Sequence, residues 1–132
     1  MIIQYRNNQD QSDPQHEAFF TESRTLSNLL DNARQKTPFI AELRGDNGFE
    51  LVMGIGGDFG CAEHIAINGD LPYLMAMSPH PPLMTGEIEF LTADTPTPIA
   101  ARYILTFVEL KEIALHFLKT GERRQSMLWE EI

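Results

Sequence analysis

Residues 39–57 read FIAELRGDNGFELVMGIGG, and this stretch decides the fold class. Apolar side chains alternate with polar ones at Phe39, Ala41 and Leu43, and the alternation resumes at Phe49 after the segment Gly-Asp-Asn-Gly. A period of two is typical of strands that bury one face, and a short glycine-containing segment between two such runs indicates a turn. The stretch therefore predicts an antiparallel hairpin.

Further short apolar runs follow this hairpin and are separated by turn residues. They cover Cys61–Ile67, Pro72–Met77, Glu87–Leu91 and Ser126–Glu131, and Met1–Tyr5 is one more candidate strand ahead of a polar loop at Arg6–Glu17. Such spacing favours an antiparallel meander. In one run Ile88 and Phe90 point to one side and the glutamates to the other, so we expect one apolar sheet face and one partly acidic face.

Two segments have helical spacing instead. The first predicts a helix over about 26–36, because apolar residues fall at i, i+3, i+4 and i+7, namely at Leu26, Leu29, Leu30 and Ala33. In the second, Thr106 and Glu109 form a capping box and Gly121 suits a left-handed cap, which predicts a helix over 107–120. We expect an α+β fold: an antiparallel meander sheet of about five to seven strands with two helices packed on one face, in a single domain spanning residues 1–132.

The charges are distributed unevenly along the chain. Residues 45–101 contain no Lys or Arg, although the 132-residue chain has 10 of them and a net charge of −9. This base-free interval holds eight carboxylates: Asp46, Glu50, Asp58, Glu63, Asp70, Glu87, Glu89 and Asp94. Such a bias favours a basic partner. The acidity argues against binding the nucleic acid backbone and against an anionic membrane surface.

Cysteine content and hydropathy limit the compartment and the chemistry. The single Cys61 excludes an internal disulfide and a cysteine-rich zinc cluster, and it fits a reducing compartment. No apolar run approaches the ~18 residues of a membrane-spanning helix, and the apolar start of the chain is too short for a signal peptide. We therefore expect a soluble cytoplasmic protein that uses no cofactor and no metal.

The glycine-rich segment Gly54–Gly60 invites comparison with a phosphate-binding loop. It lacks the GxxxxGK[ST] and GxGxxG patterns, and Asp58 would repel a phosphate, so a turn between two strands is the favoured interpretation. Cys61 and His64 would point to opposite faces of a strand, and neither could activate the other. A small enzyme or ligand-binding domain that uses Gly54–His64 is the alternative from a different functional class.

The C-terminal stretch FVELKEIALHFLKTGERRQSMLWEE, residues 107–131, closely resembles the signature that closes the first-numbered family of bacterial polymorphic-toxin immunity proteins. The matching positions are Phe117, Leu118, Thr120, Gly121, Glu122, Arg123 and Trp129. The segments LVMGIGG at 51–57, LPYLMAM at 71–77 and GEIEFL at 86–91 also look like the middle of that family. The likeness covers most of residues 51–131.

The resemblance implies a small α+β protein without enzymatic activity that binds a cognate toxin domain and blocks it, commonly a deaminase-type toxin that attacks nucleic acid. Signature residues such as Phe117, Gly121 and Trp129 suit the scaffold, so we expect the toxin contact elsewhere. Together with the base-free interval, the resemblance predicts a toxin domain with a basic surface as partner. The candidate partner-binding residues are Asp46, Glu50, Asp58, Asp70, Glu87, Glu89 and Asp94. A secretion chaperone or adaptor, which is also acidic and partner-binding, is the other alternative.

Overall fold

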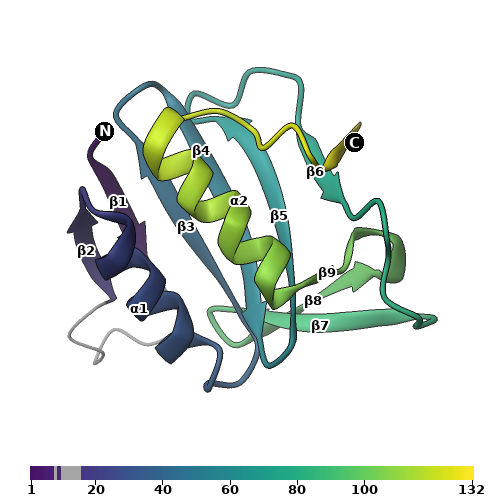
Figure 1. Cartoon of the computed structure of the whole chain (residues 1–132). Helices are drawn as coiled ribbons and strands as arrows, with labels where there is room; N and C mark the ends of the chain where they lie inside the picture. The colour runs from purple at the N-terminus through teal and green to yellow at the C-terminus, as the bar shows by residue number, and fades with distance from the viewer. Residues whose placement is uncertain (8, 10–15) are drawn as a thin grey trace.

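A computed structural model describes residues 1–7, 9 and 16–132, and it consists of two helices packed against a large, mainly antiparallel sheet (Figure 1). The helices are α1 (Ser23–Ala33) and α2 (Phe107–Thr120). The strands of the described residues are β1 (Ile3–Arg6), β2 (Glu17–Phe20), β3 (Phe39–Gly45), β4 (Phe49–Gly56), β5 (Phe59–Ala66), β6 (Leu74–Met77), β7 (Glu87–Thr92), β8 (Thr95–Ala100), β9 (Leu105–Thr106) and β10 (Leu128–Glu131). The expected α+β class is confirmed.

The central strands follow the predicted meander. Strands β3, β4, β5 and β6 pair in sequence, each antiparallel to the one before it, and the full path across the sheet is β10-β6-β5-β4-β3-β1-β2. The hairpin of residues 39–57 is β3 and β4, with Leu43 opposite Leu51. The glycine-rich segment after it forms the tight turn into β5, where Gly57 has a φ of 58°.

The predicted strand at Glu87–Leu91 forms, but it does not continue the meander. Strand β7 touches β3 through one parallel bridge between Phe39 and Leu91, and it pairs along its length with β8. We did not predict β8, because Pro96 and Pro98 argue against a strand. Since these prolines are two residues apart, both can turn their ring nitrogens away from β7, which an edge strand tolerates.

The two helices differ in how well their ends were predicted. Helix α2 has the expected bounds: Thr106 and Glu109 satisfy each other's backbone N–H groups in the capping box, and Gly121 adopts the left-handed conformation with a φ of 72°. Helix α1 is shifted three residues toward the N-terminus from the expected 26–36. Its end loosens after Arg34, because the N–H groups of Gln35 and Lys36 bond to carbonyls only three positions back.

The helices cover one face of the sheet and create the main core. Helix α2 packs on β4 and β5 and contacts α1, which lies beside it on the same face (Figure 1). Apolar residues at every second position of the strands, such as Leu43 in β3 and Leu51 and Met53 in β4, are buried beneath them. Gly60 permits this close packing, since a Cβ atom there would lie 2.6 Å from Leu110 Cδ2.

A second, smaller core lies on the opposite face. The β7–β8 hairpin crosses one end of the sheet (Figure 1) and, with the short 3-10 turn η1 (Ala101–Tyr103), covers the buried Cys61, Met75, Phe90 and Ile104. Gly54 makes room for this hairpin, because a Cβ atom there would lie 2.9 Å from the Phe90 ring. The described part of the chain places no element over the rest of that face.

Candidate interaction surface

The seven candidate carboxylates form two groups at opposite ends of the sheet. Successive turns of a meander alternate between its ends, so the β3–β4 and β5–β6 connections lie at one end and the β4–β5 turn at the other (Figure 1). The first end carries Asp46, Glu50 and Asp70. The second end carries Asp58 and the residues of the β7–β8 hairpin, Glu87, Glu89 and Asp94. The acidic interval therefore does not form one continuous surface.

Arginines from outside the base-free interval fold back onto two of these carboxylates. Arg44 Nε lies 3.1 Å from Glu50 Oε2, and Arg34 Nη2 lies 2.8 Å from Asp58 Oδ1. The interval itself contains no Lys or Arg, but arginines from other parts of the chain lie next to it in the fold. In the described part of the chain no ion pair involves the other five candidates, and Glu87 and Glu89 are exposed in strand β7.

Three of those five carboxylates accept hydrogen bonds from uncharged groups instead. Asp46 Oδ2 accepts the backbone N–H of Ile2 at 3.3 Å, and Asp94 Oδ1 accepts Gln9 Nε2 at 2.6 Å. Asp70 accepts the side-chain amide of Asn68 at 3.0 Å, which closes the turn after β5. The first two bonds link the β3–β4 and β7–β8 turns to residues near the N-terminus, and none of the three bonds compensates a negative charge.

The uncovered half of the second sheet face forms a polar surface that we call the open sheet face. Strand register aligns its side chains in two adjacent rows, because paired residues point to the same side of a sheet. One row consists of Phe19, Gln4, Arg44, Glu50 and Ile65, and the other of Glu17, Arg6, Glu42, Val52 and Glu63. Ile2, Asp46 and Ile67 lie beside the first row, two positions along the chain from Gln4, Arg44 and Ile65, and extend the open sheet face there.

Three glutamates lie close together on the open sheet face. Burial raises the pKa of Glu50, and the neighbouring Glu42 raises it further, while the hydrogen bond from Arg44 opposes the shift. Burial also raises the pKa of Glu63, and Glu50 adds to the shift. In the described part of the chain no hydrogen bond or ion pair involves the Glu63 carboxylate. The sequence prediction missed Glu42, which lies outside the base-free interval, and passed over Glu63.

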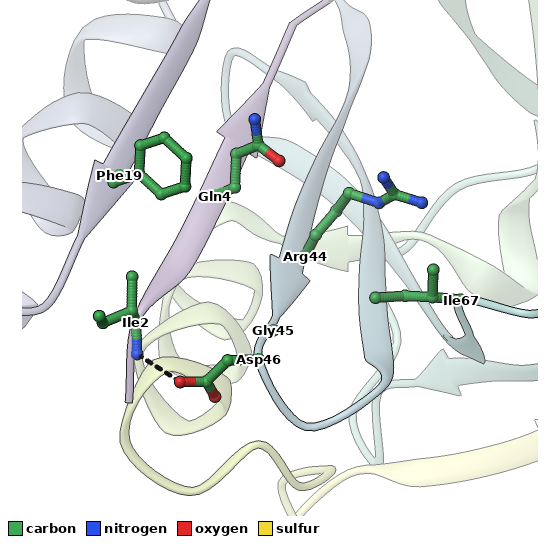
Figure 2. A pocket seen from close by; sticks show the side chains of 7 residues that line it. All are labelled: Ile2, Gln4, Phe19, Arg44, Gly45, Asp46 and Ile67. Atoms are coloured by element: carbon green, nitrogen blue, oxygen red, sulfur yellow. Dashed lines mark hydrogen bonds between the residues drawn. The ribbon is translucent and has the colours of Figure 1, made fainter.

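A shallow depression of about 260 Å³ lies at one end of the open sheet face. Figure 2 shows its lining, in which the side chains of Ile2, Phe19 and Ile67 stand around Gln4, Arg44 and Asp46. Phe19 is 71% exposed and Ile2 is 53% exposed. This apolar rim was not predicted, because Phe19 lies in β2, a strand that we did not expect from the sequence.

The alternative site at Gly54–His64 lacks the geometry for nucleophilic catalysis. Cys61 is buried in the smaller core, and this burial raises the pKa of its thiol to about 12. His64 lies on the helix-covered face, where its ring nitrogen Nε2 is 3.4 Å from the Gly121 carbonyl and burial lowers its pKa. A neutral thiol and an imidazole on opposite faces cannot form a catalytic pair.

Three signature residues of the C-terminal stretch, Phe117, Gly121 and Trp129, belong to the scaffold, as we expected. Phe117 is buried in the main core, and Gly121 caps α2. The indole of Trp129 packs against the same core and donates its Nε1–H to the Arg124 carbonyl at 3.0 Å. These contacts attach β10 to the helix end, and they leave the second sheet face free of signature residues.

Neither helix of residues 1–7, 9 and 16–132 is long and apolar enough to cross a membrane. No group of three or more His, Cys, Asp or Glu side chains among these residues is arranged to hold a metal ion.

Comparison with known families assigns the chain. A search of the curated proteins finds no match. The family model described as Immunity protein Imm1 matches residues 16–131, which is most of the chain and includes the helix α2, Gly121 and β10. The protein therefore belongs to the Imm1 family of immunity proteins, which are not enzymes, and membership of this family implies that it neutralises a cognate toxin.

Proposed function

We propose that this immunity protein neutralises a toxin domain that acts on nucleic acid, by binding a basic surface of the toxin with its own carboxylates. The observation that carries the proposal is the charge balance of the sheet ends and the second face: five of the seven candidate carboxylates have no ion-pair partner in the described part of the chain. An enzyme that holds a nucleic acid needs clustered Lys and Arg side chains to bind its phosphates. Carboxylates on a protein of net charge −9 are complementary to such a groove.

Complementary charge acts first on the speed of binding. Electrostatic steering raises association rates by roughly 10- to 1000-fold at low ionic strength, and salt screens it. A toxin that reaches the interior of a cell must be blocked before it modifies its substrate, so fast association is useful to an immunity protein. An inhibitor that occupies the cationic groove also excludes the substrate directly.

The candidate contacts remain those of the acidic interval, in the two groups that the fold separates. Asp46, Glu50 and Asp70 lie at one end of the sheet. Asp58, Glu87, Glu89 and Asp94 lie at the other. Glu87 and Glu89 suit long-range steering because they are exposed, whereas the partly buried Glu50 suits a specific contact.

The test uses the purified full chain and the toxin domain encoded beside its gene. We expect the chain to abolish toxin-catalysed deamination or cleavage of nucleic acid at equimolar concentration, and we expect the association rate to fall at least tenfold between about 50 mM and 500 mM salt. An association rate that is independent of salt would contradict the acidic-surface mechanism. A toxin that stays fully active while bound would indicate a secretion chaperone instead.

Charge reversal at one acidic group tests whether that group, or net charge alone, determines the association rate. We expect Glu87→Lys with Glu89→Lys to reduce the salt dependence of the association rate if the β7 end faces the toxin during approach. The matched control is Glu22→Lys with Glu131→Lys, which changes the net charge equally at exposed positions outside both groups. If the control pair slows association as much as the β7 pair, only net charge matters and no acidic group is specific.

A further inference from the structure

The open sheet face combines features that solvent exposure alone does not explain. Antiparallel sheets often leave one face in water, and that face is then lined by polar side chains. Here the other half of the same face is covered by the β7–β8 hairpin, while the open half presents Phe19 at 71% exposure and Ile2 at 53%. Large apolar side chains that gather around a depression with polar groups are typical of interaction sites.

The carboxylates of this face are arranged to receive a cation. In the strand register Glu42 and Glu63 flank Val52 on both sides, and Glu50 stands in the adjacent row. One of the three is paired, since Arg44 binds Glu50. Partly buried carboxylates without a cation carry a desolvation cost, and a lysine or arginine from a partner would offset that cost through charge-assisted hydrogen bonds.

We propose that the open sheet face is the toxin-binding surface, in which Phe19 and Ile2 contact apolar toxin side chains while a toxin lysine or arginine binds between the glutamates of β3, β4 and β5. This inference rests on the proposed neutralisation of a toxin and adds where the toxin docks. The apolar rim and the central carboxylates correspond to the two parts of a binding hot spot, an anchor and a desolvated charge pair.

The occupant is a toxin with a cationic protrusion and not a second copy of this chain. In a two-fold pairing both copies would present the same net negative face, because its two rows hold four glutamates against the two arginines Arg6 and Arg44, and the copies would repel each other. A cationic segment meets no such repulsion, and the carboxylates without ion pairs outnumber those that Arg44 neutralises.

The experiment measures the dissociation constant for the toxin domain encoded beside the gene. Glu42→Gln with Glu63→Gln keeps the side-chain volumes and removes both unpaired charges, and we expect binding to weaken roughly 30-fold or more. Phe19→Ala removes the exposed anchor without touching the core, and we expect roughly tenfold weaker binding. Thermal melts of each variant check that the fold is intact, and Phe19→Ala keeps the test decisive if the double variant melts early.

The matched control is Glu22→Gln with Glu131→Gln, which removes the same charge from exposed positions outside the open sheet face and outside both acidic groups, and we expect less than about a threefold change. If both open-face variants bind like the wild type while Glu87→Gln with Glu89→Gln loses binding, the inference is overturned and the β7 end is the contact, although neutralisation of the toxin stands. If the wild-type chain neither binds nor inhibits the toxin domain, the proposed function itself fails.

Discussion

The capping box at the start of α2 stabilises the scaffold on the face opposite the open sheet face. One substitution can therefore separate an effect on stability from an effect on toxin binding. Thr106 Oγ1 accepts the Glu109 N–H at 3.2 Å, and a Glu109 carboxylate oxygen accepts the Thr106 N–H at 3.0 Å. Thr106→Ala removes the first of these bonds and leaves the second, so the expected loss is that of one N-cap, about 1 kcal/mol. With an unfolding entropy of about 2.1 cal/mol/K per residue, a chain of 132 residues should melt about 3 to 4 °C lower.

The assay pairs a thermal melt with toxin binding. Because α2 lies on the helix-covered face, opposite the open sheet face, we expect Thr106→Ala to lower the melting temperature and to leave the dissociation constant for the toxin unchanged (Figure 1). Thr106→Ser keeps the hydroxyl and serves as the control, with a melt near that of the wild type. An unaltered melting temperature for Thr106→Ala would refute the capping argument, and lost toxin affinity in a folded variant would place α2 in the interface.

Three further outcomes follow from the packing and the buried groups. Gly60→Ala should lower the free energy of unfolding by about 1 to 3 kcal/mol in urea titrations, because its Cβ atom would lie 2.6 Å from Leu110 Cδ2 and 2.8 Å from the Gly54 carbonyl; a stability equal to the wild type would contradict this packing. Folding raises the pKa of Glu63 above its ordinary 4.5, so its stabilising contribution is fully present below that value and is lost as pH rises through the folded pKa. Glu63→Gln should therefore be more stable than the wild type at neutral pH, with the difference vanishing at acid pH, whereas a constant difference would exclude Glu63 as its source. The Cys61 thiol, buried and with a pKa of about 12, should react with a thiol reagent at pH 8 only after unfolding, and rapid labelling of the folded protein would contradict its burial.

Helix α2 and strands β3 and β4 could be predicted because the residues that determine them are close together in the sequence. The capping box and Gly121 gave α2 its bounds, because both act within one turn of the helix ends. The alternation around residues 45–48 likewise predicted β3 and β4, since a tight turn fixes their register. Strand β8 escaped prediction because its prolines are tolerated only at a sheet edge, and its edge position depends on the tertiary fold.

The interaction surface was harder to predict than the fold, because charges distant in sequence meet in space. The base-free interval suggested unopposed acid, yet Arg34 and Arg44, which precede it in the chain, form ion pairs with Asp58 and Glu50 inside it. The open sheet face draws on β1, β2 and β3 as well, so no window of sequence contains it. One signal was available: Glu42 alternates with Ala41 and Leu43, and antiparallel pairing then sets it on the same face as Glu50.

Competition between the chain and the nucleic acid substrate for the toxin domain tests the central claim most directly. The claim is that carboxylates of the immunity protein occupy the basic surface on which the toxin holds its substrate. It predicts that the apparent dissociation constant of the chain rises in proportion to the concentration of an uncleavable substrate, with no ternary complex. A stable ternary complex of toxin, substrate and immunity protein, with the dissociation constant unchanged, would contradict it.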